Sequence, residues 1–281
     1  MSSAVSRSRT GFWLSLCTAA WVLVAAEFVS AGSVTPANLS ETVRNADDYY
    51  LGRRNLQNVH EAIQLLRSSV AANPGDYEAW WRLSKFYCYL ARQSQKPEKQ
   101  KFLGQGVETG TRAVSVAPAR VEGHFWLGAN LGLTAEERGM VRGVFLIDRI
   151  RSEMETVARL DPDYEQAAGW RTLGRLYYRA PFFKGGNKRR SIELLEKCLA
   201  LYPDNSLAML YLADSYLAMG LRQEAHEQLE RILALCPDPN YGPELAQNQD
   251  EARARLAKNF RAENEDRPAL RSLALSAVSR R

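Results

Sequence analysis

Apolar residues recur at helical spacing in two consecutive segments between positions 209 and 237. In the first segment, Met209, Leu212 and Tyr216 fall on one face of a predicted helix. Gly220 follows at a position suited to ending that helix. The apolar face of the second segment contains Ala225, Leu229 and Ile232, and Pro237 follows it. Proline cannot continue a helix, so the pattern predicts a hairpin of two helices that ends at Pro237.

The same order of residues precedes four other prolines, Pro74, Pro118, Pro162 and Pro203. In the copies that end at Pro118, Pro162 and Pro203, the corresponding first-helix residues are Trp80, Leu83-Ser84 and Tyr87; His124, Leu127-Gly128 and Leu131; and Trp170, Leu173-Gly174 and Tyr177. The copy ending at Pro74 keeps Ala62 and Leu66 of its second helix, and its first helix is expected at about 39–54. The chain therefore contains about five predicted helix pairs over residues 39–237.

Three of these copies are longer than the one that ends at Pro237. We expect an insertion at 180–186 in the copy ending at Pro203, and longer insertions between the helices of the copies ending at Pro162 and Pro118. After the last copy, Glu244 to Phe260 forms a single predicted helix with Ala252, Leu256 and Phe260 on one side. A stack of helix pairs needs its last apolar face covered, so this helix is expected to be a cap.

A large apolar residue, Leu-Gly, Tyr, Ala and Pro at these spacings resemble the tetratricopeptide repeat (TPR). The resemblance implies an all-α fold of TPR-type helix-turn-helix repeats, stacked in a right-handed superhelix with a C-terminal capping helix. Residues 39–261 would form the array of about five helix pairs plus the capping helix. Residues 262–281 would be a flexible C-terminal tail.

The N-terminal segment has the order of a secretory signal peptide. Arg7 and Arg9 precede an uncharged run from 11 to 26, and the small residues of Val29-Ser30-Ala31 follow. We expect residues 1–31 to be removed after Ala31, with 32–38 as a linker, which makes the protein exported and either periplasmic or secreted. The alternative is an uncleaved N-terminal membrane anchor, the one case in which we expect contact with a membrane; the run is shorter than the roughly 20 residues that span a bilayer.

In a TPR array the first helix of each pair lines a concave groove. Positions one, five and eight after each leading residue are expected to face it, which predicts a partner-binding set of Trp81, Lys85, Phe125, Arg171, Arg175 and Tyr178. Aromatic and basic residues together suit a protein or peptide partner with apolar anchors and an acidic or carboxylate group. The alternative is that Trp81 and Phe125 pack under the neighbouring insertions while the arginines pair with local Glu residues.

A second candidate site follows the insertion at 180–186. Lys184, Lys188 and Arg189 flank a predicted helix start, and backbone amides beside cations could hold an anion. The alternative is a Gly185-Gly186 pair that only turns the chain, with a solvated basic edge.

Composition argues against most other functions. The chain has 281 residues, of which 46% are hydrophobic and 25% charged, an ordinary balance for a globular core. Its formal charge of +5 is dispersed, whereas nucleic-acid binders gather Lys and Arg on one face, so no nucleic-acid partner is expected. Without residues 1–31, three cysteines remain, Cys88, Cys198 and Cys236, and an odd count predicts mostly buried thiols.

The residues that catalysis or metal binding would need are not clustered. His60, His124 and His226 lie in three different repeats, and none has another His or Cys at metal-ligand spacing. No serine nucleophile motif or glycine-rich dinucleotide turn is present in the sequence. We therefore expect a binding protein without catalytic residues, metal or cofactor.

A narrower resemblance is carried by five further stretches. They are Leu160-Asp161-Pro162-Asp163-Tyr164, Leu173-Gly174-Arg175-Leu176-Tyr177, the insertion from Pro181 to Gly186, the helix from Ser191 to Leu201, and Tyr241-Gly242-Pro243-Glu244-Leu245. They resemble the TatT component, a family of exported TPR-like proteins associated with tripartite ATP-independent periplasmic (TRAP) transporters. This resemblance implies a periplasmic helper that associates with a solute-binding protein and holds or conducts an apolar ligand. The leading expectation remains an exported TPR scaffold or adaptor that binds its partner through the groove.

Overall fold

The structure is a computed structural model that describes residues 40–237 and 242–260. The predicted signal peptide at 1–31, the linker at 32–38 and the tail at 262–281 lie outside these residues.

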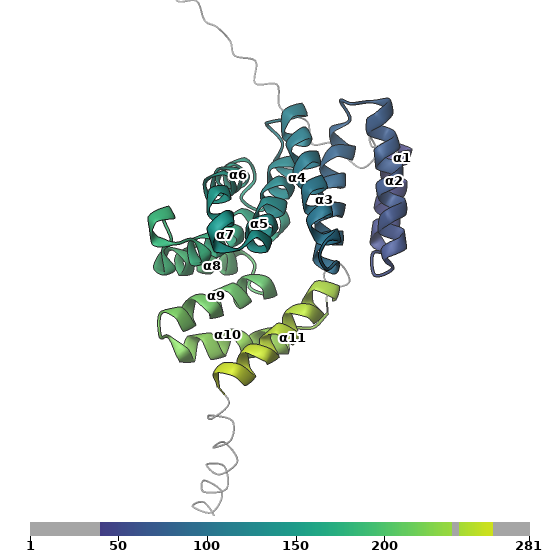
Figure 1. The fold of residues 1–281 in the computed structure, drawn as a ribbon. Helices are drawn as coiled ribbons and strands as arrows, with labels where there is room; N and C mark the ends of the chain where they lie inside the picture. The colour runs from purple at the N-terminus through teal and green to yellow at the C-terminus, as the bar shows by residue number, and fades with distance from the viewer. Residues whose placement is uncertain (1–39, 238–241, 261–281) are drawn as a thin grey trace, which may run out of the picture. The chain divides into compact units, whose positions relative to one another are not determined.

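The regular structure of the described residues is entirely helical (Figure 1). The α-helices are α1 (Glu41–Leu51), α2 (Leu56–Ala72), α3 (Tyr77–Gln93), α4 (Glu98–Val116), α5 (Val121–Gly143), α6 (Ile147–Leu160), α7 (Tyr164–Arg179), α8 (Lys188–Leu201), α9 (Ser206–Ala218), α10 (Arg222–Ala234) and α11 (Gly242–Asn259). Two short 3₁₀ helices, η2 (Val144–Leu146) and η3 (Phe182–Lys184), lie after α5 and α7. The all-α fold of TPR-type helix pairs is confirmed.

Local sequence signals explain where several helices begin and end. Asp76 and Asn205 precede α3 and α9, and their side chains accept hydrogen bonds from the amides of Ala79 and Ala208, which leaves fewer unpaired amides at each helix start. Gly220 ends the turn after α9 with a φ of 78°, a left-handed conformation that glycine adopts without a steric penalty. The capping pattern thus divides the chain into hairpins.

The hairpins stack so that their first helices form a row. Each helix contacts the next along the chain, and α1, α3, α5, α7, α9 and α11 also contact one another in that order. Glycine permits the closest approaches: a Cβ on Gly110 of α4 would lie 2.9 Å from the Cα of Leu127 on α5. The predicted cap is confirmed, because α11 packs on α9 and α10 and buries Ala252, Leu256 and Phe260.

The predicted insertions take two different forms. Residues 180–186 form a connection that contains η3, as expected. The expectation of a long connection in the copy ending at Pro118 is wrong, because only residues 94–97 separate α3 from α4, and the extra residues lengthen α4 to 19 residues. In the copy ending at Pro162, the backbone of Gly139 is not helical, with a φ of 71°. The residues from 139 to the end of η2 therefore connect the regular part of α5 with α6. The longer α4 buries Leu103 in the core, which stabilises the additional helical turn.

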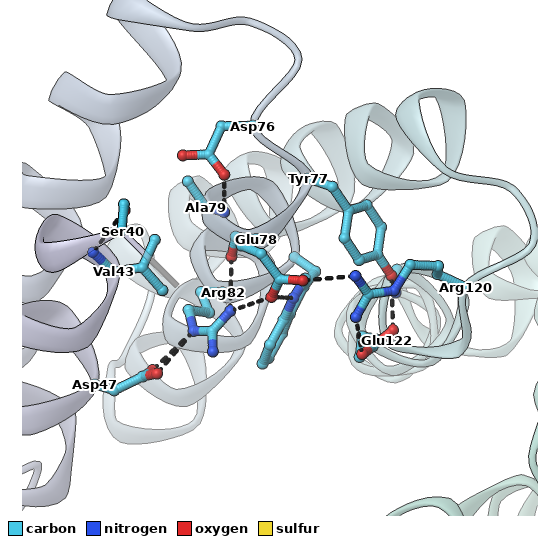
Figure 2. Close-up of polar contacts among 12 residues, drawn as sticks. Ser40, Val43, Asp47, Asp76, Tyr77, Glu78, Ala79, Arg82, Arg120 and Glu122 are labelled. Carbon is cyan, nitrogen blue, oxygen red and sulfur yellow. Dashed lines mark hydrogen bonds and ion pairs between the residues drawn. The ribbon is translucent and has the colours of Figure 1, made fainter. Parts of the chain in front are cut away.

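An ion-pair network joins α1, α3 and α5 (Figure 2). The Nε atom of Arg82 on α3 donates to both carboxylate oxygens of Asp47 on α1, at 2.9 and 3.0 Å. Arg82 also donates to Glu78 at 2.6 Å. The other oxygen of Glu78 accepts from Arg120, again at 2.6 Å, and Arg120 reaches Glu122 at 2.7 Å. Because the Arg82 side chain is only 7% exposed, these carboxylates take the place of water as its hydrogen-bond partners.

Candidate functional site

The row of first helices borders a cavity of about 1300 Å³. Its walls come from α1, α3, α5, α7 and α9, and the start of α11 contributes Glu244, Leu245 and Asn248. An ion pair of 3.2 Å between Arg53 and Glu244 connects the turn after α1 with the start of α11. Segments from the two ends of the array therefore border the same cavity, which we call the central cavity.

Five of the six residues predicted to face the groove line the central cavity, namely Lys85, Phe125, Arg171, Arg175 and Tyr178. Trp81 does not. Its indole Nε1 donates to Glu78 at 2.9 Å, and the guanidinium of Arg82 lies 4.1 Å from the centre of its ring. The side chain of Trp81 is thus held by the ion-pair network, outside the lining of the central cavity.

Lys85 projects its ammonium between two aromatic rings of the cavity wall. Its Nζ lies 5.1 Å from the ring centre of Tyr50 and 5.4 Å from that of Trp126. Burial lowers the pKa of Lys85, and the charges of Glu165 and Asp47 oppose this effect. Among the described residues, no carboxylate lies within the 4 Å of an ion pair with Lys85, although burying an unpaired charge is costly.

The two predicted arginines have partners, but these are not local glutamates. Arg175 pairs with Asp214 of α9 at 2.7 Å, and Asp214 also accepts from Arg255 of α11 at 2.7 Å. Burial alone would raise the pKa of Asp214, but the hydrogen bond and charge of Arg255 and the charge of Arg175 lower it below its usual value. Arg171 donates to the backbone carbonyl oxygen of Glu165 at 3.2 Å.

The two predicted aromatic residues differ in their surroundings. Phe125 is 7% exposed, and its ring packs edge-on against Trp126 and Tyr164, at 4.8 and 5.3 Å between ring centres. Tyr178 lies beside two cations, with its ring centre 5.2 Å from the Arg175 guanidinium and 4.2 Å from the Lys188 ammonium. Phe125 is therefore mainly a core residue. Tyr178, in contrast, packs beside the basic side chains of the cavity wall.

A left-handed turn near the start of α7 was not predicted. Glu165, Gln166 and Ala167 have φ values of 47°, 57° and 57°, a conformation that costs non-glycine residues about 1–2 kcal/mol each. Arg171 and the side-chain amide of Asn205 both donate to the backbone oxygen of Gln166, at 3.3 Å each. The turn brings Glu165 and Gln166 into the cavity wall, and no glycine or asparagine at these positions could have signalled it.

The cavity wall carries more basic than acidic side chains. Seven basic residues line it, Arg53, Lys85, Arg92, Arg171, Arg175, Arg179 and Lys188, against four acidic ones, Glu136, Glu165, Asp204 and Glu244. Apolar residues of α5, η2 and α6 also line the cavity, including Leu133, Val144 and Ile147. The cavity therefore combines an apolar surface with a positive excess.

The three cations of the predicted anion site have separate surroundings. Lys184 pairs with Asp148 at 2.7 Å, Lys188 donates to the backbone oxygen of Tyr178, and Arg189 is exposed. The three cations therefore do not converge, because Asp148 neutralises Lys184 and Lys188 turns toward the central cavity. The glycine pair turns the chain, as the alternative stated: Gly185 has a φ of 81°, and a Cβ on Gly186 would overlap the backbone oxygen of Ala180.

The histidines and cysteines have structural surroundings. His124 is hydrogen-bonded to Glu153 at 2.6 Å and to the backbone oxygen of Pro118 at 2.9 Å. Cys88 and Cys198 are buried and Cys236 is exposed, in agreement with mostly buried thiols. Within residues 40–237 and 242–260, no group of three metal-ligating side chains is found. None of the helices in these ranges is both long and apolar enough to cross a bilayer.

Two family models match the chain. The model described as "Regulator of microtubule dynamics protein 1-3" matches residues 42–181, and a tetratricopeptide-repeat model matches residues 186–242. No protein with a curated description matches significantly.

Two solved structures are similar to the chain in fold. A thermophilic TPR protein of Thermus thermophilus is 22% identical over 75% of this chain and 96% of its own, with a TM-score of 0.55. PilW, a type IV pilus biogenesis factor, is 19% identical over 82% of this chain and 96% of its own, with a TM-score of 0.53.

Proposed function

We propose that this chain, which belongs to the tetratricopeptide-repeat superfamily, is a scaffold that binds a partner protein or peptide segment in its central cavity. Repeats of this kind present the first helix of each pair as a binding surface. In this chain, five such helices border one cavity, together with the start of α11. We propose binding without catalysis.

Lys85 is the observation that supports an acidic partner. Its ammonium lies between the rings of Tyr50 and Trp126, and no carboxylate among the described side chains pairs with it. A partner carboxylate entering the cavity would supply the missing charge. The basic excess of the wall would add long-range attraction.

The apolar wall of the cavity supports a partner that also has apolar side chains. Leu133, Val144 and Ile147 lie along the cavity on α5, η2 and α6, so a peptide bound through its carboxylate could place apolar side chains against them. The partner is therefore proposed to be an extended segment that combines an acidic residue or chain end with apolar anchors.

Selection of peptide ligands tests this proposal. Peptides are selected from a random display library on the purified protein, and their affinities are measured by fluorescence anisotropy. We expect the selected peptides to contain a carboxylate beside apolar residues. Lys85→Met should weaken their binding at least about tenfold, because a charged hydrogen bond contributes about 1.5–3 kcal/mol.

Lys101→Met is the matched control, since Lys101 is exposed on α4 and does not line the cavity. It should leave the affinity unchanged. Lys85 is a cleaner choice than Arg171 or Arg175, because both arginines hold parts of the fold in place. Equal affinities of the two lysine variants, or selected peptides that lack acidic groups, would exclude Lys85 as the anchor.

We further propose that the protein is exported, on the sequence of residues 1–31, which precede the described residues. N-terminal sequencing of the protein isolated from its native cells tests this. A mature chain that begins at Gly32 would support export to the periplasm or secretion, whereas an intact Met1 would indicate the membrane-anchored alternative.

A second candidate function is a transport helper similar to TatT. The apolar wall of the cavity on α5 and α6 favours it, because small-molecule sites are lined mostly by apolar side chains. Such a helper should co-purify with a periplasmic solute-binding protein and carry an apolar ligand that native mass spectrometry detects. A scaffold should bind peptides and carry neither.

A further inference from the structure

Four apolar side chains are almost fully exposed on two neighbouring connections of the array. Val141 and Phe145, at the junction of α5 with η2 and α6, are 82% and 79% exposed. Phe182 and Phe183, in η3 between α7 and α8, are 92% and 77% exposed. Single exposed apolar residues are common, but four at such exposure in two connections call for an explanation.

Two contacts hold these connections against each other. Lys184, which directly follows Phe183, forms an ion pair of 2.7 Å with Asp148. Arg151 donates to the backbone oxygen of Lys184 at 2.6 Å. Phe145 lies three residues before Asp148, so the two side chains share one helical face. The two connections therefore lie side by side, and we call them, with their four exposed apolar side chains, the phenylalanine corner.

Exposed arginines occur along the same connections. They are Arg138 and Arg142, on either side of Gly139 in α5, Arg149 near the start of α6 and Arg189 near the start of α8. Within the described part of the chain, none of these four pairs with a carboxylate; Arg149 donates to the hydroxyl of Thr111. The exposed acid Asp148 is already paired with Lys184 and Arg151.

We propose that the phenylalanine corner docks on the surface of an anionic lipid bilayer. Aromatic rings beside arginines match the polarity of such a surface, because the rings enter the headgroup region while the guanidinium groups meet lipid phosphates. The rings project from turns and do not line a groove, so they suit a deformable surface better than a shaped protein pocket. This docking is independent of ligand binding in the central cavity.

Photocrosslinking in the full chain tests the proposal. Phe182 is replaced by a photoreactive phenylalanine analogue, and the protein is irradiated with vesicles of phosphatidylcholine and phosphatidylglycerol. Lipid adducts at this position are measured by mass spectrometry. Leu201 is the control position, because it is partly exposed at the opposite end of α8. We expect at least about tenfold more adduct at position 182 than at position 201.

The charge requirement is tested with the pair Arg142→Gln and Arg189→Gln. Because each basic residue near an anionic surface contributes about 1 kcal/mol, the double variant should lower the adduct at position 182 about tenfold or more. Pure phosphatidylcholine vesicles should give a similar reduction. Far-UV circular dichroism should match that of the parent chain, since both arginines are exposed.

Three results would overturn the proposal. They are equal adduct at positions 182 and 201, equal adduct on neutral and anionic vesicles, and crosslinking of position 182 in cells to a protein in place of lipid. The last result would assign the corner to a protein partner.

Discussion

Glu78 at the centre of the network in Figure 2 offers a direct test of how the first repeats are held together. Its carboxylate accepts hydrogen bonds from the indole of Trp81 at 2.9 Å and from Arg82 and Arg120 at 2.6 Å each. Glu78→Gln keeps the shape of the side chain and replaces one of its acceptor oxygens by a donor. One guanidinium would then face an amide NH₂ group and lose its bond.

The expected cost follows from the burial of these groups. Charged hydrogen bonds contribute about 1.5–3 kcal/mol each, and breaking a fully buried ion pair costs about 3–5 kcal/mol. Glu78 is 17% exposed, Arg82 keeps Asp47, and Arg120 keeps Glu122, so only part of the buried-pair cost applies. We expect Glu78→Gln to lower the free energy of unfolding by about 2–3 kcal/mol.

Urea denaturation followed by circular dichroism measures this loss. The control is Glu193→Gln, which removes a carboxylate from an ion pair of similar length with Arg190; both side chains are about half exposed, at 52% and 50%. That variant should cost less than about 0.5 kcal/mol. If Glu78→Gln costs no more than Glu193→Gln, the network does not stabilise the array and the reasoning fails.

The difference in the free energy of unfolding between wild type and Glu78→Gln should depend on pH. Burial raises the pKa of Glu78, but hydrogen bonds from Trp81 and Arg82 and the charge of Arg120 lower it below the ordinary value. A depressed pKa stabilises the folded state above the unfolded pKa of about 4.3, and this contribution is lost as the pH falls through the folded value. The difference between wild type and Glu78→Gln should therefore be constant from about pH 5 to 7 and shrink in more acidic solution.

Two further predictions concern the core and the interhelical histidine. Gly110→Ala would place a Cβ 2.9 Å from the Cα of Leu127, so we expect α4 and α5 to separate and urea denaturation to give a loss of about 1–3 kcal/mol. Gly104→Ala, with no atom within 4 Å of the added Cβ, should be neutral or stabilising, and equal losses in the two variants would refute close packing as the cause. The hydrogen bond with Glu153 raises the pKa of His124, so its stabilisation should be complete below about pH 6.5 and disappear as the pH rises through the folded value. Urea denaturation across this range should show the loss in wild type and not in Glu153→Gln, and a loss that persists in the variant would assign it to another group.

The helical repeats could be predicted from the sequence because their cores are local. Met209, Leu212 and Tyr216 recur at helical spacing, and Gly220 marks the turn. Residues close to one another in the sequence are therefore enough to predict both helices of that hairpin. The capping helix followed from the same period. The length of α4 did not, because a helix continues as long as the neighbouring helix buries its next turn.

The groove was predicted from repeat register, which fixes the direction of a side chain but not its partners. Lys85 and Tyr178 face the central cavity as the register indicated. Trp81 has an equivalent position but is held by Glu78 and Arg82, which are its neighbours on α3. Whether a side chain turns toward the cavity or toward a neighbouring charged group depends on interatomic distances, and the repeat register does not give these distances.

The sequence by itself determined the repeats, the helices of the last hairpin, and the basic and aromatic character of the first helices, because these depend on residues within one or two helical turns. Only the tertiary structure decided which charges are paired. Asp214 lies 39 positions from Arg175 and neutralises it, whereas Lys85 remains without a carboxylate among the described residues. Stacking of the helices sets these distances, and two opposite charges form a salt bridge only when nitrogen and oxygen approach within about 4 Å.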